Sequence, residues 1–250
     1  MKRQIQLFFA ALLYFTRIPC PVKVGHSPDQ VSRAVRYFPL IGLIVGSLAA
    51  FAYFAASRVL SPATSVLLSM IASILITGAF HEDGFADFCD GFGGGWSRER
   101  ILEIMRDSRI GVFGAIGVGS ILALKYHLLL ELNQASLIPL LISGHALSRL
   151  FPICVAFALP YAREGDQLKP TASNPNRTEL AVAFVFGVAP LIYFGPSILI
   201  PVVASTLAAI CLAFYIRKWI GGFTGDCMGA IQQVTEVVFY AGAVVTWKFL

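Results

Sequence analysis

Charged residues are scarce in this chain. They make up only 13% of its 250 residues, against about 25% in an average soluble domain. Hydrophobic residues make up 57%, and the mean hydropathy is +0.74. This balance excludes an ordinary soluble domain and predicts a polytopic membrane protein. The length has room for about seven spans of about 20 residues each, in one integral membrane domain over residues 1–250.

Cysteine motifs, basic runs and a signal cleavage site are also missing. The five cysteines contain no C-x-x-C pair, so neither a disulfide framework nor a zinc site is indicated. The net charge of +5 forms no basic run or stripe, and we therefore expect no nucleic-acid partner. The first apolar run is followed by Thr16-Arg-Ile-Pro19 where a small-residue cleavage site would stand, which favours an uncleaved interfacial helix.

Seven apolar segments predict membrane spans. Their approximate bounds are 37–56, 63–80, 112–132, 137–159, 180–194, 198–216 and 228–250. We expect an all-α helical bundle of about seven transmembrane helices, with an interfacial N-terminal helix and a cytoplasmic amphipathic helix over 97–109. In the first span, Gly42 and Gly46 have the small-xxx-small spacing of a helix contact face.

Lysine and arginine predict the orientation. Fifteen of the 19 fall in segments on one side of the predicted spans, and only Arg58 and Lys248 fall on the other. The more basic side is expected to be cytoplasmic. The sequence thus predicts a multi-pass protein of a bacterial or archaeal cytoplasmic (inner) membrane, with the lipid bilayer as a partner and the active site facing the cytoplasm.

Three aspartates follow the second predicted span. Asp83, Asp87 and Asp90 stand at i, i+4 and i+7, which places them on one face of a helix. Carboxylates crowded on one stripe repel each other unless a cation lies between them. Mg²⁺ suits them because it takes oxygen ligands and bridges carboxylates to substrate phosphates. We interpret the three as metal ligands, with His81 nearby as either a catalytic or a boundary residue.

A second charged group follows the glycine-rich run 91–95, which we expect to break the helix and form a hinge. Arg106 and Arg109 suit bidentate binding of phosphate oxygens, and Asp107 suits a metal or a hydroxyl proton. A surface charge cluster is the alternative. We predict that the two arginines bind substrate and that Asp107 is catalytic.

Two further groups complete the predicted site. Arg149 lies within a span, where a charge must pair or face an aqueous cavity, and we expect it to bind substrate. Thr224, Gly225 and Asp226 precede the last span, where a helix N-terminus favours phosphate binding. The sequence alone therefore predicts a phosphate and metal site at a membrane surface.

These residues together resemble the cobalamin-5'-phosphate synthase family (adenosylcobinamide-GDP ribazoletransferase). The matching motifs are Thr16-Arg-Ile-Pro19, Tyr37-Phe-Pro-Leu-Ile-Gly42, Thr77-Gly-x-x-His81-x-Asp-Gly-x-x-Asp87-x-x-Asp-Gly91, Glu103-Ile-Met-Arg-Asp-Ser-Arg-Ile-Gly111, Ser148-Arg149, Tyr161-Ala-Arg163 and Gly221-Gly-x-Thr-Gly-Asp226. The resemblance implies attack by alpha-ribazole, or its 5'-phosphate, on adenosylcobinamide-GDP with release of GMP, using Mg²⁺. It also leaves other corrinoid-pathway enzymes, or a second copy of the chain, as further partners.

Three other interpretations compete with this one. A CDP-alcohol phosphotransferase shares the start of the aspartate motif, but Gly94-Gly95 stand where Ala-Arg is expected. An aspartate-rich prenyltransferase would carry a second aspartate pair, and only Asp226 lies near a suitable place. An ion-coupled transporter could use Asp83, Arg149 and Glu236 as a charge relay, but it leaves the aspartate stripe unexplained.

Overall fold

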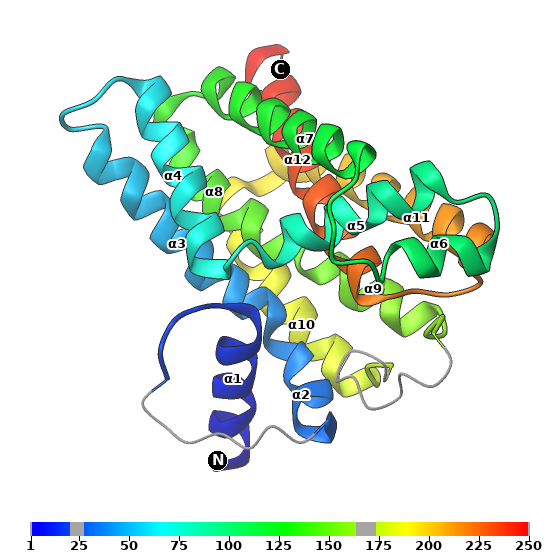
Figure 1. Cartoon of the computed structure of the whole chain (residues 1–250). Coiled ribbons are helices and arrows are strands. Elements are labelled where there is room, and N and C mark those ends of the chain that lie inside the picture. The colour runs from blue at the N-terminus through cyan, green and yellow to red at the C-terminus, as the bar shows by residue number, and fades with distance from the viewer. Residues whose placement is uncertain (1, 21–27, 164–173, 250) are drawn as a thin grey trace.

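A computed structural model describes residues 2–20, 28–163 and 174–249. The regular elements in these ranges are all helices, which confirms the predicted all-α fold (Figure 1). In chain order they are α1 (Lys2–Phe15), α2 (Pro28–Ala34), η1 (Val35–Tyr37), α3 (Phe38–Ala56), α4 (Pro62–Thr77), α5 (Phe80–Gly94), α6 (Arg98–Ile104), α7 (Val112–Glu131), α8 (Gln134–Ser148), α9 (Leu150–Ala158), α10 (Arg177–Val188), η3 (Ala189–Ile198), α11 (Leu199–Ile220) and α12 (Gly225–Phe249).

Several helical stretches are long and apolar enough to cross a membrane. In the described residues there are five: Gln30–Ala56, Val112–Glu131, Gln134–Ala158, Arg177–Ile220 and Gly225–Lys248. The pair α4 and α5 passes the same test only jointly, which gives up to six. The predicted count of seven is therefore not confirmed. One reason is that 177–220, expected as two spans, is a single stretch of 44 residues in which Gly195, at φ 57°, kinks the backbone.

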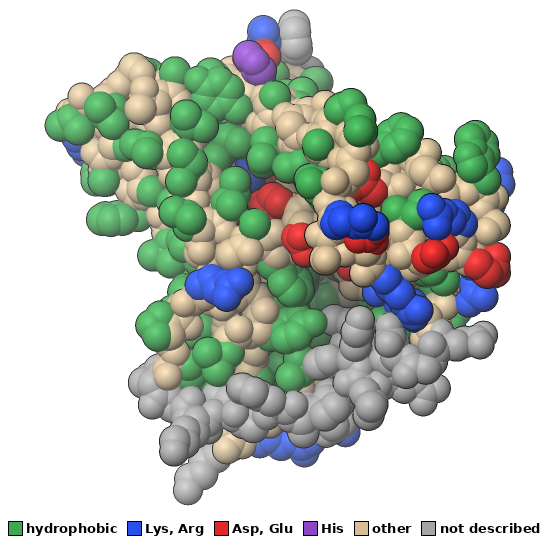
Figure 2. Space-filling view, in the orientation of Figure 1, with side chains coloured by type: hydrophobic (Ala, Val, Ile, Leu, Met, Phe, Trp, Pro, Cys, Tyr) green, Lys and Arg blue, Asp and Glu red, His purple; other side chains and the backbone are tan. Residues whose placement is uncertain are grey.

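The outer surface of the spans is apolar. Phe51, Ile116 and Phe214 are each more than 60% exposed, as expected of side chains that face hydrocarbon rather than water. Figure 2 shows hydrophobic side chains spread over α3, α4 and α7, while acidic and basic side chains gather around α6. This separation confirms the multi-pass membrane class and places a group of charged side chains around α6.

The predicted glycine contact face joins α3 to α8. A Cβ atom on Gly46 would lie 2.9 Å from Ile142 Cα and 3.0 Å from His145 Cβ, so only glycine permits this approach. Gly42, one turn earlier, lies against the backbone oxygen of His145 and the side chain of Arg149. The small-xxx-small prediction is confirmed, and the contact sets the depth at which α8 carries its polar side chains.

A sharp bend separates α4 from the aspartate helix. Gly78 and Ala79 both adopt left-handed backbone angles, with φ 66° and 58°, and α5 leaves α4 at 88°. Left-handed geometry costs a residue with a Cβ atom roughly 1 kcal/mol, so packing must stabilise Ala79. Arg17 contributes, because its backbone N–H donates to Ile76 O at 2.7 Å and its side chain lies over Gly78.

This bend corrects the prediction that the second span runs straight into the aspartates. They do not extend the C-terminal end of α4. They lie on a new helix, and Asp83 is in its first turn. A helix N-terminus carries partial positive charge, so the helix dipole stabilises Asp83 instead of opposing it.

The glycine run 91–95 is not a hinge, contrary to expectation. α5 continues through it to Gly94, because α6 packs closely over these residues. A Cβ atom on Gly95 would lie 2.6 Å from Ile101 Cγ1. The amphipathic helix is also shorter than the predicted 97–109. Its N-cap is Ser97, whose Oγ accepts from Arg100 N, but it ends at Ile104 and leaves 106–109 in a loop.

Candidate active site

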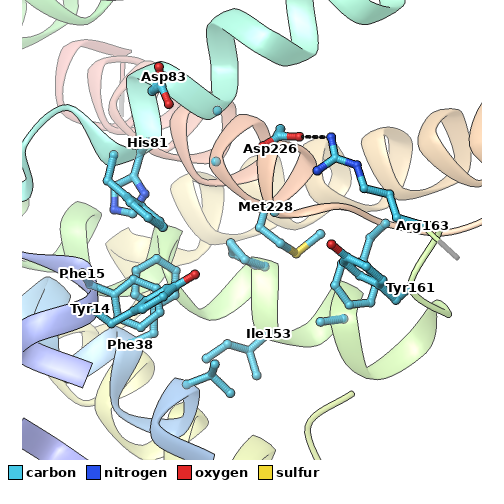
Figure 3. Close-up of a pocket in the computed structure, with 18 residues that line it drawn as sticks. Tyr14, Phe15, Phe38, His81, Asp83, Ile153, Tyr161, Arg163, Asp226 and Met228 are labelled. Atoms are coloured by element: carbon cyan, nitrogen blue, oxygen red, sulfur yellow. Dashed lines mark hydrogen bonds and ion pairs between the residues drawn. The ribbon is translucent and has the colours of Figure 1, made fainter. Parts of the chain in front are cut away.

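A cavity of about 250 Å³ opens where α5 meets the start of α12. Figure 3 shows its two ends: Asp83, Asp226 and Arg163 lie at one, and a group of aromatic rings from α1 and α3 lies at the other. Between them stand His81 from α5 and Met228 from α12. Residues 161–163 complete the wall, and Tyr161 forms an isolated β-bridge with Phe223. The cavity thus unites segments from the whole length of the chain.

Two glycines bring α5 and α12 together at this point. A Cβ atom on Gly84 would lie 3.2 Å from Asp226 Cα, and one on Gly229 would lie 3.3 Å from Gly84 Cα. The two backbones therefore cross with almost no side chain between them. As a consequence, Asp226 at the start of α12 stands beside Asp83 and Asp87 on α5.

The predicted aspartate group consequently has a different membership. Asp87 is half-buried, and the negative charges acting on it are, in decreasing order, those of Asp226, Asp83 and Asp90. The cation that opposes them is Arg163. The sequence assigned Asp226 to phosphate binding only, whereas in the structure its charge also acts on Asp87.

Arg163 is the main residue that the sequence prediction missed. It is 7% exposed, and its Nη2 atom lies 2.7 Å from Asp226 Oδ2 and donates to Met105 O at 3.4 Å. Its Nε atom has no hydrogen-bond partner among the described residues. The sequence signal that could have identified Arg163 as a site residue was the motif Tyr161-Ala-Arg163. Its partner Asp226 lies 63 residues away in the chain, so the contact could not be seen in the sequence.

Asp90 has an interaction that its sequence position did not suggest. Its two oxygens accept from the backbone N–H groups of Gly111, at 2.7 Å, and Gly114, at 2.8 Å. Gly111 is the N-cap residue of α7, so a carboxylate from α5 satisfies the otherwise unpaired amides at this helix start. Asp90 therefore joins α5 to α7, and both of its oxygens are engaged there.

We expect Asp90→Ala to destabilise the protein by about 1–2 kcal/mol, the usual loss when a helix cap is removed. Asp90→Asn keeps one acceptor oxygen and should lose roughly half as much. Thermal unfolding of the purified protein in detergent measures both. An unchanged unfolding temperature in Asp90→Ala, together with loss of activity, would contradict the cap assignment and favour the predicted metal role.

The loop with Arg106, Asp107 and Arg109 lies outside the cavity lining. Arg109 Nη2 lies 2.6 Å from Asp107 Oδ2, and both side chains are exposed. The side-chain hydrogen bond from Arg109 lowers the pKa of Asp107 to about 2. The loop runs from Met105, whose carbonyl accepts from Arg163, to Gly111, which donates to Asp90. It therefore adjoins the site but is not part of the cavity wall as the structure stands.

Arg149 lies in a separate, fully buried polar cluster, not in the cavity wall. Its Nη1 atom donates to His145 O at 2.9 Å, and its side chain is 1% exposed. In the same cluster Glu236 Oε1 lies 2.6 Å from Lys125 Nζ and 3.5 Å from His145 Nε2. Buried charges inside a bilayer are paired in this way because isolated ones are costly.

This buried cluster reaches the aspartate helix through glutamine side chains of α12. Gln232 Nε2 donates to Glu236 Oε2 at 2.5 Å, and Gln233 Nε2 donates to Glu82 Oε1 at 3.0 Å. α5, α7, α8 and α12 are thus tied together by side-chain polar contacts behind the cavity.

The acidic side chains can be tested for a fit to Mg²⁺. Asp83, Asp87 and Asp226 offer only oxygen donors, which suits a hard divalent ion, and two of them, Asp83 and Asp226, line the cavity. In the described part of the chain, no three histidine, cysteine, aspartate or glutamate side chains are placed closely enough to hold a metal ion. The oxygen donors suit Mg²⁺ by their chemistry. The dependence of activity on Mg²⁺ stays a prediction.

Comparison with known proteins supplies the family context. A family model described as cobalamin-5-phosphate synthase matches residues 7–244. A protein of Leptospira interrogans is 43% identical over 99% of this chain and 98% of its own length. Proteins of Shewanella frigidimarina and Ralstonia nicotianae are 41% and 44% identical, each over 95% of this chain and 94% of its own length. All three are named adenosylcobinamide-GDP ribazoletransferase. No solved structure matches the chain.

Proposed function

The chain belongs to the cobalamin-5-phosphate synthase family, and from this membership we propose that it joins alpha-ribazole, or its 5'-phosphate, to adenosylcobinamide-GDP with release of GMP. The observation that carries the proposal is the family match over nearly the whole chain, together with relatives above 40% identity that bear this activity's name. The protein is accordingly a transferase of cobalamin biosynthesis, with these two molecules as its substrates.

The reaction requires a phosphoryl-type transfer. A hydroxyl oxygen of the ribazole forms a bond to the phosphorus that carries the corrinoid, the bond from that phosphorus to the bridging oxygen breaks, and GMP leaves with that oxygen. The protein mainly has to position the groups and neutralise charge. The polar end of the cavity suits the diphosphate, because Gly225 and Asp226 begin α12 there and backbone amides at a helix start bind phosphate. Arg163 adds donors beside them, whereas Thr224, also predicted to bind substrate, is fully buried and its hydroxyl oxygen accepts from Cys227 N.

Mg²⁺ would be held by Asp83 and Asp87, with Asp226 in place of the predicted Asp90, whose oxygens bind the start of α7. When bound, the ion would neutralise charge on the diphosphate. Arg163 would balance the remaining charge from its place in the cavity wall. Arg106 and Arg109 would reach the same phosphates only if their loop moves inward from its present exposed position.

Two residues were predicted to be catalytic, and the geometry favours His81 as the acceptor of the hydroxyl proton. Its ring lines the cavity, and its Nε2 atom has no partner in the described structure. Asp107 is a poor base in this conformation, because the hydrogen bond from Arg109 lowers its pKa to about 2. Arg149 would act indirectly, by shaping the wall behind Phe38, whose ring centroid lies 5.6 Å from its guanidinium carbon.

The proposed location is the cytoplasmic (inner) membrane, with the cavity facing the cytoplasm. Arg58 and Lys248, the two cations predicted to be external, both lie near the connection between α7 and α8. Arg58 follows α3 and lines a hollow together with Gln134 at the start of α8. Lys248 Nζ lies 3.1 Å from Glu131 Oε2 at the end of α7. Cations concentrate at the opposite, cavity-bearing end, as the positive-inside rule requires of a cytoplasmic face.

The activity is tested directly with purified protein in detergent. Given adenosylcobinamide-GDP and alpha-ribazole 5'-phosphate, we expect stoichiometric formation of GMP and of the joined corrinoid, measured by liquid chromatography. Chelation of divalent ions should abolish turnover, and Mg²⁺ should restore it. Absence of GMP with both forms of the acceptor, from protein that is folded by its unfolding transition, would refute the proposal.

A further inference from the structure

The cavity has a second end whose chemistry the transfer reaction does not explain. Its lining away from the aspartates is almost wholly apolar and comes mainly from α1, η1, α3 and α9. The residues are Tyr14, Phe15, Val35, Phe38, Phe80, Pro152, Ile153 and Ala156. Figure 3 shows the rings of Tyr14, Phe15 and Phe38 grouped below His81, at a distance from Asp226 and Arg163. An apolar wall offers a diphosphate neither cations nor hydrogen-bond donors, so this end of the cavity suits a different part of a substrate.

The aromatic rings at this end are arranged by mutual packing. Phe15 stacks on Phe38 with ring centroids 4.1 Å apart, and Tyr14 meets Phe15 edge-on at 4.9 Å. Phe80 meets Phe15 and Tyr14 at 5.9 and 5.6 Å. Aromatic walls of this kind favour a flat aromatic group, which gains stacked or edge-to-face contacts in addition to its burial.

His81 marks the border between the two ends. It is 2% exposed, and its ring lies 5.4 Å from that of Phe38 and 5.3 Å from that of Phe80. Its Nε2 atom is buried without a hydrogen-bond partner among the described residues. A buried polar atom without a partner is costly, so the geometry indicates that a bound molecule places a polar group beside Nε2.

Size and polarity decide which substrate group fits. At about 250 Å³ the cavity is slightly smaller than the usual range of ligand pockets, so it can hold only a part of the two substrates. Guanine carries donors and acceptors along its edge, and burying them against phenylalanine and isoleucine would leave them unpaired. The base of alpha-ribazole is a benzimidazole, which has an apolar edge and loses little when buried there.

We propose that the aromatic end binds the base of the acceptor nucleoside and selects an apolar base of benzimidazole type over a purine. The inference rests on the proposed function and deepens it. The ribose then lies at His81, and its hydroxyl groups point toward the polar end, where the diphosphate is bound. The guanosine and the corrinoid extend outside the enclosed volume.

The test is a binding measurement that needs no turnover. Calorimetric titration of the purified protein with alpha-ribazole, in the absence of adenosylcobinamide-GDP, gives the affinity for the acceptor alone. In the wild-type protein we expect alpha-ribazole to bind at least tenfold more tightly than the alpha-riboside of adenine, because the adenine amino group and ring nitrogens find few partners at the apolar end. Equal affinity for the two nucleosides would overturn the proposal.

A matched pair of variants locates the site. Ala156→Phe fills the aromatic end and should weaken alpha-ribazole binding at least tenfold. Its affinity for adenosylcobinamide-GDP should change less than twofold. Ala158→Phe introduces the same side chain on the same helix, but into a groove on the other face of α9, and should leave both affinities within twofold.

Two results would contradict the assignment. They are unchanged alpha-ribazole affinity in Ala156→Phe, and an equal loss of affinity for adenosylcobinamide-GDP, which would place the guanosine or the corrinoid at the aromatic end. Wild-type GMP release, measured on the same preparation, tests the transferase activity separately. A protein that releases GMP but does not discriminate between the bases overturns only the base-binding proposal.

Discussion

Asp87→Asn is expected to lower turnover by on the order of a thousandfold while leaving the fold intact. The substitution keeps the shape of the side chain and removes the charge that stands among Asp226, Asp83 and Asp90. If these carboxylates hold Mg²⁺ on the diphosphate, a lost ligand charge removes stabilisation at the place where charge must be neutralised during transfer. Steady-state GMP formation over a range of Mg²⁺ concentrations measures the effect.

Thermal unfolding separates this explanation from simple misfolding. Without Mg²⁺, the neutral side chain relieves like-charge repulsion, so the unfolding temperature of Asp87→Asn should equal or exceed that of the wild type. Adding Mg²⁺ should stabilise the wild type, because an ion that binds only the folded state shifts the equilibrium toward it, and should stabilise the variant much less. Glu103→Gln, the same neutralisation at an exposed position of α6, is the control and should keep full activity. Near-normal turnover of Asp87→Asn at low Mg²⁺ would refute the shared metal site.

Lys125→Met is expected to be strongly destabilising, by about 3–5 kcal/mol, because it leaves the buried Glu236 carboxylate without its directly paired cation. The Nζ–Oε1 distance is 2.6 Å, and both side chains are at most 5% exposed. The double variant Lys125→Met with Glu236→Gln removes both charges and should recover most of the loss. Unfolding transitions in detergent for the wild type and the three variants form a complete double-mutant cycle.

The comparison pair for this cycle is Lys248 with Glu131, at the exposed end of the bundle. Its side chains are 57% and 47% exposed, so Lys248→Met should cost less than about 1 kcal/mol. If the two buried substitutions are additive, Lys125 and Glu236 are not energetically coupled. In that case the ion pair between Lys125 and Glu236 would not stabilise the packing of α7 against α12.

The parts of the fold that follow from local sequence were predictable. Apolar runs located most of the membrane-crossing helices, although not their number, and the Gly42 and Gly46 spacing indicated a helix contact face, which joins α3 to α8. Both signals lie within single helices. The bend at Gly78 and Ala79 was not predictable, because it depends on Arg17 from a distant segment lying over it. The helical glycine run 91–95 was missed for the same reason. Glycine disfavours an isolated helix, and only the packing of α6 explains why it is helical here.

The candidate site divides in a similar way. Residue type and spacing singled out Asp83, Asp87 and Asp226 as chemically important. They did not indicate that Gly84 and Gly229 join them, nor that Asp90 is engaged with α7. Arg163 and the aromatic rings of α1 were overlooked because one is a lone arginine in a loop and the others resemble ordinary core residues. Their proximity to the aspartates exists only in the folded chain.

The right-angle turn after α4 also has a consequence for the surrounding lipid. At about 1.5 Å per residue, the 16 residues of α4 reach only about 24 Å, short of a hydrocarbon layer of about 30 Å. Because α5 turns away at 88°, it does not complete the crossing along the same axis. A span this short is accommodated by thinning of the bilayer, by flanking side chains that reach the interface or by self-association. We therefore expect bilayer thickness to act on the bend that positions the aspartates.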